Sequence, residues 1–174
     1  MDTASCLHML DEAIRFEQDG LGYFKDAAQR TKNAYGKLMF DAIAKAELKH
    51  IEVIRKIYDE LTASGQWPDQ CPAFESSSHV KNIFEKARAE LNDKVDVHAD
   101  DLEAVKLARG YEEKGIKFYK ELSGKAALDI EKKFYERLAQ EERGHLLILQ
   151  DMDDYYADPV HWFSKKEHLH WDGA

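Results

Sequence analysis

Glu47 and His50 stand three residues apart in AIAKAELKHIEVI, a stretch that otherwise has the apolar pattern of a buried helix. Helical spacing places both on the stripe that carries Ile43, Ile51 and Ile54. Burying a lone carboxylate costs several kcal/mol or forces the group to take up a proton. A bound metal ion would remove that cost, because the ion supplies the opposite charge.

The same pair of residues recurs 95 positions later as Glu142 and His145. At this offset Glu17 pairs with Glu112, inside the similar segments FEQDGLGYFKD and YEEKGIKFYKE. The neighbours of each Glu at helical spacing are mainly small or apolar, so we expect all four carboxylates to be buried. The alternative is a set of helices whose Glu and His side chains are solvated.

Four buried carboxylates repel one another and become protonated unless cations lie between them. Two divalent cations would balance the four charges, and the histidines would bind as neutral imidazoles. One Glu from each of two helices and Glu-x-x-His from each of the other two is the di-iron or di-manganese arrangement of ferritin-like bundles. The candidate ligands are Glu17, Glu47, His50, Glu112, Glu142 and His145.

Long helices must position these side chains. The chain has only three prolines and nine glycines in 174 residues, and Ala, Leu, Glu, Lys and Ile fill the stretches between them. The fold class predicted is therefore all-α. Hydrophobic periodicity predicts long helices over about 5–32, 35–64, 100–124 and 127–156, with a shorter amphipathic helix over about 80–91.

Short links at about 32–35 and 124–127 predict two antiparallel hairpins. The middle connection has about 35 residues, enough to recross the bundle, and we expect the third long helix to run parallel to the first. The prediction is a ferritin-like four-helix bundle over residues 1–157. It includes a crossover linker with the short helix at about 65–99, and a Trp- and His-rich tail over 158–174 is expected to fold back on it.

Charge and composition exclude several functions. The formal net charge of −9 opposes non-specific binding to nucleic acid or to an anionic membrane surface. The longest aliphatic run, LLIL, is far too short to span a bilayer, and no leader-like segment opens the chain. Cys6 and Cys71 do not form a disulfide framework and are expected to be free thiols. We expect a cytoplasmic protein.

In its six candidate ligands and their spacing, the chain resembles the rubrerythrin family of ferritin-like di-iron proteins. The resemblance extends from about residue 5 to residue 156. The resemblance implies that the six candidate residues bind two iron ions, with Glu47 and Glu142 as bridging carboxylates. Manganese or zinc would also accept this mixture of oxygen and nitrogen donors. The implied function is an oxidoreductase that reduces hydrogen peroxide or dioxygen as Fe(II) becomes Fe(III). A ferroxidase or iron-handling protein and a non-catalytic metal-binding scaffold stay open as alternatives.

Two departures from the family pattern bear on function. Full-length rubrerythrins carry a further carboxylate three residues after the ligand of the third helix, where this chain has Gly115. They also have a rubredoxin-type domain with two Cys-x-x-Cys pairs, which two separated cysteines cannot build. We therefore expect an external electron donor such as rubredoxin. Separately, we expect the chain to form a homodimer.

Tyr119 and Tyr135 lie one heptad from Glu112 and Glu142, whereas the first hairpin has phenylalanine at the corresponding positions. Their hydroxyls could hydrogen-bond to the ligands, or the rings could be ordinary core aromatics. In the tail, His168 and His170 could bind another metal together with His161. We expect instead that they are packed against the bundle or lie at the surface, as such histidines more often do.

Overall fold

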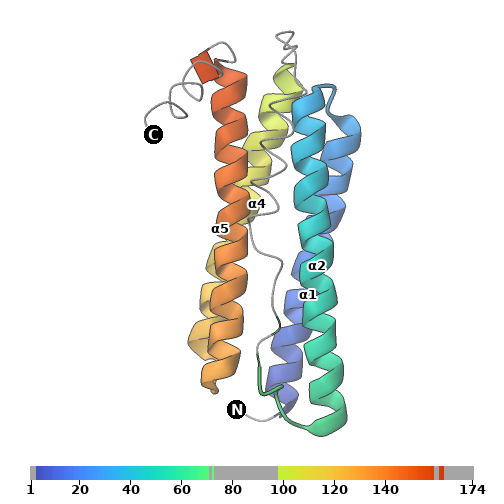
Figure 1. Cartoon of the computed structure of the whole chain (residues 1–174), viewed down its shortest axis with the longest axis vertical. Helices are drawn as coiled ribbons and strands as arrows, with labels where there is room; N and C mark the ends of the chain where they lie inside the picture. The colour runs from blue at the N-terminus through green and yellow to red at the C-terminus, as the bar shows by residue number, and fades with distance from the viewer. Residues whose placement is uncertain (1–2, 71, 73–97, 159–160, 163–174) are drawn as a thin grey trace, which may run out of the picture.

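Four long helices form a bundle in the computed structural model, which describes residues 3–70, 72, 98–158 and 161–162 (Figure 1). The prediction of an all-α, ferritin-like bundle is confirmed, and the described residues contain no strand. The short helix expected at 80–91 lies outside the described residues. The helices are α1 (Thr3–Arg30), α2 (Ala34–Ser64), α4 (Ala99–Lys125) and α5 (Asp129–Ala157).

The helix ends fall within two residues of those expected, and local capping explains both ends of α2. Helix α2 begins at Ala34, one residue earlier than expected, because Asn33 is its N-cap. The Asn33 side chain accepts a hydrogen bond from the Gly36 backbone N–H at 2.9 Å. At its other end α2 stops at Gly65, whose φ of 70° is the left-handed conformation that glycine adopts without strain.

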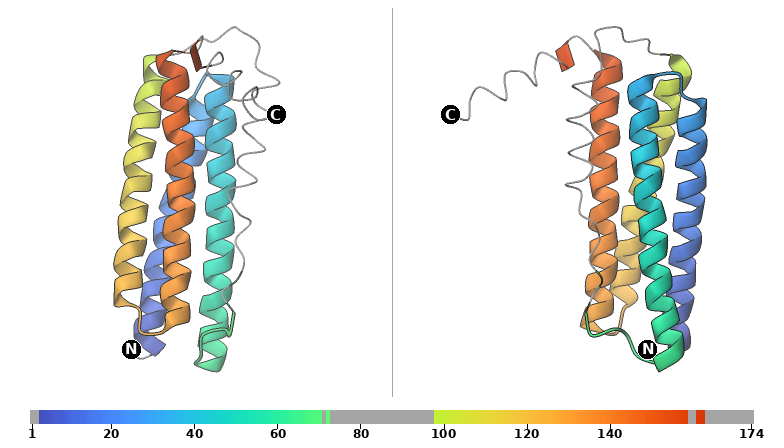
Figure 2. Two further views of the ribbon diagram at one scale, coloured as in Figure 1. Left: turned by 60° about the vertical axis from the view of Figure 1, so that its left-hand side comes forward. Right: turned by 45° about the vertical axis from the view of Figure 1, so that its right-hand side comes forward.

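The direction expected for the third long helix was wrong. Figures 1 and 2 show that α4 runs parallel to α2 and antiparallel to α1. The contacts between α1 and α4 agree, because the Tyr23 hydroxyl donates to the Ala104 carbonyl at 2.9 Å, whereas the Tyr111 hydroxyl donates to the Phe16 carbonyl at 2.6 Å. A connection that returns to the far end of the bundle makes the next helix repeat the direction of the helix before it.

The interior of the bundle contains two apolar clusters with a charged layer between them. Toward the end where α1 meets α2, buried side chains such as Phe40 and Leu149 pack together. Toward the end that holds the start of α1, a second cluster includes Leu10 and Phe134. The two hairpins therefore enclose a polar centre with apolar packing above and below it.

The beginning of the tail packs on the bundle. The Trp162 ring is buried, with its centroid 5.6 Å from that of Tyr35 and 5.2 Å from that of Tyr155. His161 is exposed, and its Nδ1 lies 2.6 Å from a carboxylate oxygen of Asp158. His168 and His170 lie outside the described residues. Among the helices that the structure describes, none is long and apolar enough to cross a membrane.

Candidate metal centre

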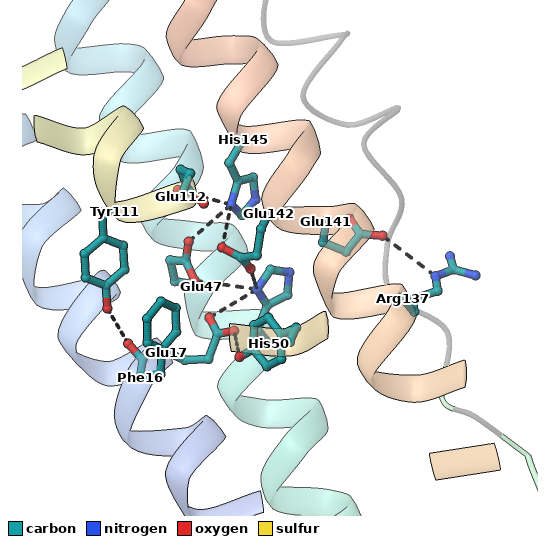
Figure 3. Close-up of polar contacts among 11 residues, drawn as sticks. Phe16, Glu17, Glu47, His50, Tyr111, Glu112, Arg137, Glu141, Glu142 and His145 are labelled. Carbon is teal, nitrogen blue, oxygen red and sulfur yellow. Dashed lines mark hydrogen bonds and ion pairs between the residues drawn. The ribbon is translucent and has the colours of Figure 1, made fainter. Parts of the chain in front are cut away.

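The six predicted ligand residues meet in the charged layer midway along the bundle, as Figure 3 shows. Each helix supplies its share, with one Glu from α1, one Glu from α4, and Glu-x-x-His from both α2 and α5. All six side chains are buried, with at most 3% of any residue exposed. The spacing that puts Glu and His on one helical face therefore brings all six residues together.

The six residues divide into two overlapping groups whose donor atoms lie within 4.8 Å of one another. We call the group that contains Glu17 and His50 position A, and the group that contains Glu112 and His145 position B. In position A the Nδ1 of His50 lies 3.2 Å from an oxygen of Glu17. In position B the Nδ1 of His145 lies 3.6 Å from an oxygen of Glu112.

Glu47 and Glu142 belong to both positions and divide their oxygens between them. The Oε2 of Glu47 lies 3.5 Å from the Nδ1 of His50, and its Oε1 lies 3.2 Å from that of His145. Glu142 has the opposite assignment, with Oε1 3.4 Å from His50 and Oε2 3.9 Å from His145. Each of these carboxylates therefore presents one oxygen to each position, as a bridging ligand must.

Burial and mutual repulsion change the proton affinities of the outer carboxylates. Burial raises the pKa of Glu17 to about 8, with the charge of Glu47 adding to the effect and that of His50 opposing it. Burial raises the pKa of Glu112 well above its usual range, and the charge of Glu142 raises it further. In the absence of a cation, these two groups retain protons at a pH where exposed carboxylates have lost them.

The two histidines show the complementary effect. Burial acts to lower the pKa of His50, but neighbouring carboxylates, Glu17 first, raise it well above its ordinary value. The pKa of His145 is likewise raised, by Glu47 against the effect of burial. Burial also acts to raise the pKa of Glu47, but hydrogen bonding within the cluster leaves it lowered. Without metal the cluster thus balances its charge with protons, which a cation would displace.

The donor atoms fit a pair of divalent cations. Among the described residues, both oxygens of Glu112 and Oε1 of Glu142 are buried without a hydrogen-bond partner. Buried polar atoms rarely stay unsatisfied, because desolvation without a partner is costly. Four carboxylates and two imidazoles match the charge and the donor preference of two iron or manganese ions.

Equivalent residues of the two hairpins meet across the centre. The rings of His50 and His145 stack with centroids 5.4 Å apart and an angle of 19° between their planes. Phe16 and Tyr111, also 95 positions apart, stack with centroids 5.0 Å apart. Repeat-related residues that meet at one place, on helices that run antiparallel, indicate a two-fold relation between the repeats. The hairpins are therefore related by a pseudo-two-fold axis through the centre.

The two candidate tyrosines occupy different surroundings. The Tyr119 hydroxyl donates a hydrogen bond to Oε1 of Glu17, so it contacts a predicted ligand. The Tyr135 hydroxyl has no hydrogen-bond partner within the described part of the chain. Its ring lies in the apolar cluster near the start of α1, with its centroid 6.3 Å from that of Trp67. The structure therefore supports a ligand contact for Tyr119, whereas Tyr135 is a core aromatic.

Two pairs of residues around the centre were not predicted as functional. A Cβ atom on Gly20 would lie 2.9 Å from the ring of Tyr111, and one on Gly115 would lie 3.2 Å from the ring of Phe16. Each glycine thus makes room for the aromatic residue that precedes the ligand Glu on the opposite helix. The internal repeat contains the signal, because the offset of 95 relates Gly20 to Gly115 and Phe16 to Tyr111.

Comparison with protein families matches the model described as Rubrerythrin to residues 8–152, which is most of the chain. No curated protein and no solved structure gave a significant match. The matched span includes all six residues of the two positions, and it confirms the resemblance inferred from the sequence.

Proposed function

The chain belongs to the rubrerythrin family, and we propose that it is a di-iron oxidoreductase that reduces hydrogen peroxide or dioxygen with electrons from an external donor. The observation that carries the proposal is the pair of overlapping donor groups that share Glu47 and Glu142. Two metals held by shared carboxylates can act on one substrate together, which suits a two-electron reaction.

The protein residues contribute charge balance, orientation and exclusion of water. Glu47 and Glu142 each direct one oxygen to position A and one to position B, which fixes the separation of the two positions. The apolar clusters above and below keep bulk water from the centre. When bound, two Fe(II) ions would supply the two electrons that one peroxide molecule requires.

The proposed external donor follows from the cysteine content. A rubredoxin-type iron site needs four thiolates, and the 174 residues contain only Cys6 and Cys71. The described residues hold no further cluster of three metal-binding side chains that could serve instead. We therefore expect one turnover from the bound irons and further turnovers only when a small donor such as rubredoxin supplies electrons. The homodimer expected from the sequence stays a prediction.

Anaerobic reconstitution with Fe(II), followed by addition of peroxide, tests the proposal. We expect two irons per chain, consumption of about one equivalent of peroxide, and renewed consumption after a reduced donor is added. Glu47→Ala and Glu142→Ala should each lose at least one iron. Glu52→Ala is the matched control, because Glu52 is an exposed carboxylate on α2 that pairs only with Lys49 among the described residues.

Three results would contradict the proposal in different ways. Full iron occupancy in both bridging variants would overturn the bridging assignment. Binding of two irons without oxidation by peroxide or dioxygen would favour the scaffold alternative. Oxidation followed by release or storage of the ferric product, with no donor-dependent turnover, would favour the ferroxidase alternative.

A further inference from the structure

The outer carboxylates of positions A and B are equivalent in the repeat, but they differ in what holds them. Both oxygens of Glu17 have a partner, since Oε1 accepts the Tyr119 hydroxyl and Oε2 lies 3.2 Å from the Nδ1 of His50. Neither oxygen of Glu112 has a hydrogen-bond partner within the described residues, and its contact with His145 is longer, at 3.6 Å. Glu17 therefore accepts a hydroxyl donor and a short imidazole contact that together hold its orientation, whereas Glu112 has no such hydroxyl donor among the described residues.

One hydroxyl group accounts for the difference. Tyr119 lies 95 positions after Phe24, so the pseudo-two-fold axis places Phe24 opposite Glu112 as Tyr119 lies opposite Glu17. Phe24 is fully buried, and its ring centroid lies 6.2 Å from that of Tyr111, the residue next to Glu112. A phenylalanine at this place can fill the core, but it cannot donate a hydrogen bond.

We propose that Tyr119 is a positioning residue that makes the two metal positions unequal, so that position A binds a divalent cation first and more tightly than position B. The inference rests on the proposed di-metal centre. A carboxylate already held in one orientation loses less conformational freedom when it binds a cation. Residues that hydrogen-bond to ligands in this way commonly contribute about 10- to 100-fold to metal affinity.

The packing of Tyr119 allows the hydroxyl to be removed alone. Its ring centroid lies 6.0 Å from that of Phe16 and 5.1 Å from that of Phe118, in contacts that a phenylalanine ring would retain. Tyr119→Phe thus deletes the donor to Glu17 and leaves the aromatic packing in place. The reciprocal variant Phe24→Tyr offers a hydroxyl to Glu112 and provides a second, independent test.

The experiment is an anaerobic titration of the metal-free chain with Co²⁺ against a competing chelator, followed by visible absorbance and calorimetry. The native chain should bind two ions in two resolved steps. Tyr119→Phe should weaken the first step by about 10- to 100-fold and leave the other step unchanged. Phe24→Tyr should tighten the second step, and the double variant should reverse the order in which the positions fill.

A second readout follows the tyrosine itself. The first equivalent of Co²⁺ should change the near-ultraviolet tyrosine absorbance of the native chain, because the ion binds Glu17, to which the Tyr119 hydroxyl donates. The second equivalent should change it much less, and Tyr119→Phe should lose the first change. A general loss of folding would weaken both steps together and is checked by thermal unfolding of the metal-free proteins.

The outcomes separate this inference from the proposed function. Two equal binding steps in the native chain, or an unchanged first step in Tyr119→Phe, would overturn the role of Tyr119 while leaving the di-metal centre intact. Absence of binding by either Co²⁺ or Fe²⁺ in the folded native chain would overturn the centre itself.

Discussion

The hairpin of α1 and α2 and the hairpin of α4 and α5 contribute the same ligand types at the same spacing, but different residues surround those ligands. The equivalent candidate ligands meet in one shared cluster, where the charges of four buried carboxylates must be balanced together. The surrounding residues are instead determined by the packing of each hairpin. Phe24 and the equivalent Tyr119, for example, lie in different apolar clusters. We therefore expect the two equivalent sets of candidate ligands to give metal positions of unequal affinity.

The two glycines near the centre show the same combination of likeness and difference. Gly20 and Gly115 both follow a ligand Glu by three residues and both accommodate an aromatic ring from the opposite helix. The nearest neighbours differ, since a Cβ atom on Gly115 would lie 3.1 Å from Oε2 of Glu142, whereas the three atoms nearest to one on Gly20 all belong to Tyr111. A side chain at position 115 would therefore press on Glu142, whereas one at position 20 would press first on the ring of Tyr111.

The largest expected effect concerns pH and the stability of the metal-free protein. Because the pKa of Glu17 is about 8 in the fold against about 4.5 ordinarily, the folded state binds more protons between these values. Stability is therefore greatest at the acidic end of this range and falls as the pH rises through about 8. A tenfold change in proton affinity is worth about 1.4 kcal/mol, so the loss reaches a few kcal/mol. Denaturant unfolding at several pH values measures it.

Comparison of Glu17→Gln with Glu112→Gln makes this test specific to each hairpin. The charge of His50 offsets part of the rise in the pKa of Glu17, whereas the main charges acting on Glu112 all raise its pKa. We expect Glu112→Gln to reduce the pH dependence more than Glu17→Gln. Saturating metal should abolish the loss of stability at high pH, because the cation replaces the protons. A metal-free chain that gained stability as the pH rose would contradict this account.

The convergence of the six candidate ligands could be predicted from sequence, because burial and helical spacing both constrain their positions. A carboxylate on an apolar stripe needs an opposite charge or a proton to offset the cost of burying it. The offset of 95 showed that the same Glu and His residues recur in the second hairpin. The direction of α4 was predicted wrongly, although a connection that recrosses the bundle implies that α4 repeats the direction of α2. The error lay in the geometric step from crossover to helix direction, and the antiparallel arrangement of α1 and α4 is what brings Tyr119 to Glu17.

The roles of Tyr119 and Tyr135 could not be separated from sequence, because both stand one heptad from a ligand. Heptad spacing identifies a helical face, but it does not give the direction of the hydroxyl at the end of a long side chain. That direction depends on the rings packed around it. Tyr119 packs against Phe16 beside Glu17, whereas Tyr135 lies near Trp67 in the apolar cluster near the start of α1.

The next effect in size separates the two glycines. Gly115→Ala should weaken metal binding, because the new Cβ would press on Glu142, and it should destabilise the metal-free fold by about 1–3 kcal/mol. Gly20→Ala should destabilise the fold by a similar amount, through the ring of Tyr111, while both metals still bind. Metal stoichiometry and denaturant unfolding give the two readouts. Equal loss of metal in the two variants would show that the glycines do not differ in function.

The smallest effect concerns the start of the second helix in each hairpin, where equivalent positions are capped differently. Asn33 caps α2 with its own side chain, whereas Leu128 has no side-chain hydrogen bond at the same position of α5. At the start of α5, the side chain of Glu131 accepts a hydrogen bond from the Ala127 backbone N–H at 3.1 Å. The second hairpin therefore lacks the N-cap acceptor that the first hairpin has.

Exchanging the caps tests whether this local difference affects stability. Asn33→Ala should lower the free energy of unfolding by about 1 kcal/mol, because the buried Gly36 N–H loses its acceptor. Leu128→Asn should raise it by about 0.5–1 kcal/mol, since the extended backbone of Leu128 already suits an N-cap and the residue is 49% exposed. Both changes lie far along the helices from the centre, so metal stoichiometry should stay at two in each variant. Unfolding of the metal-free proteins by denaturant gives the energies. A loss of stability in Leu128→Asn would mean that Glu131 already satisfies this helix start, and that each hairpin is fully capped in its own way.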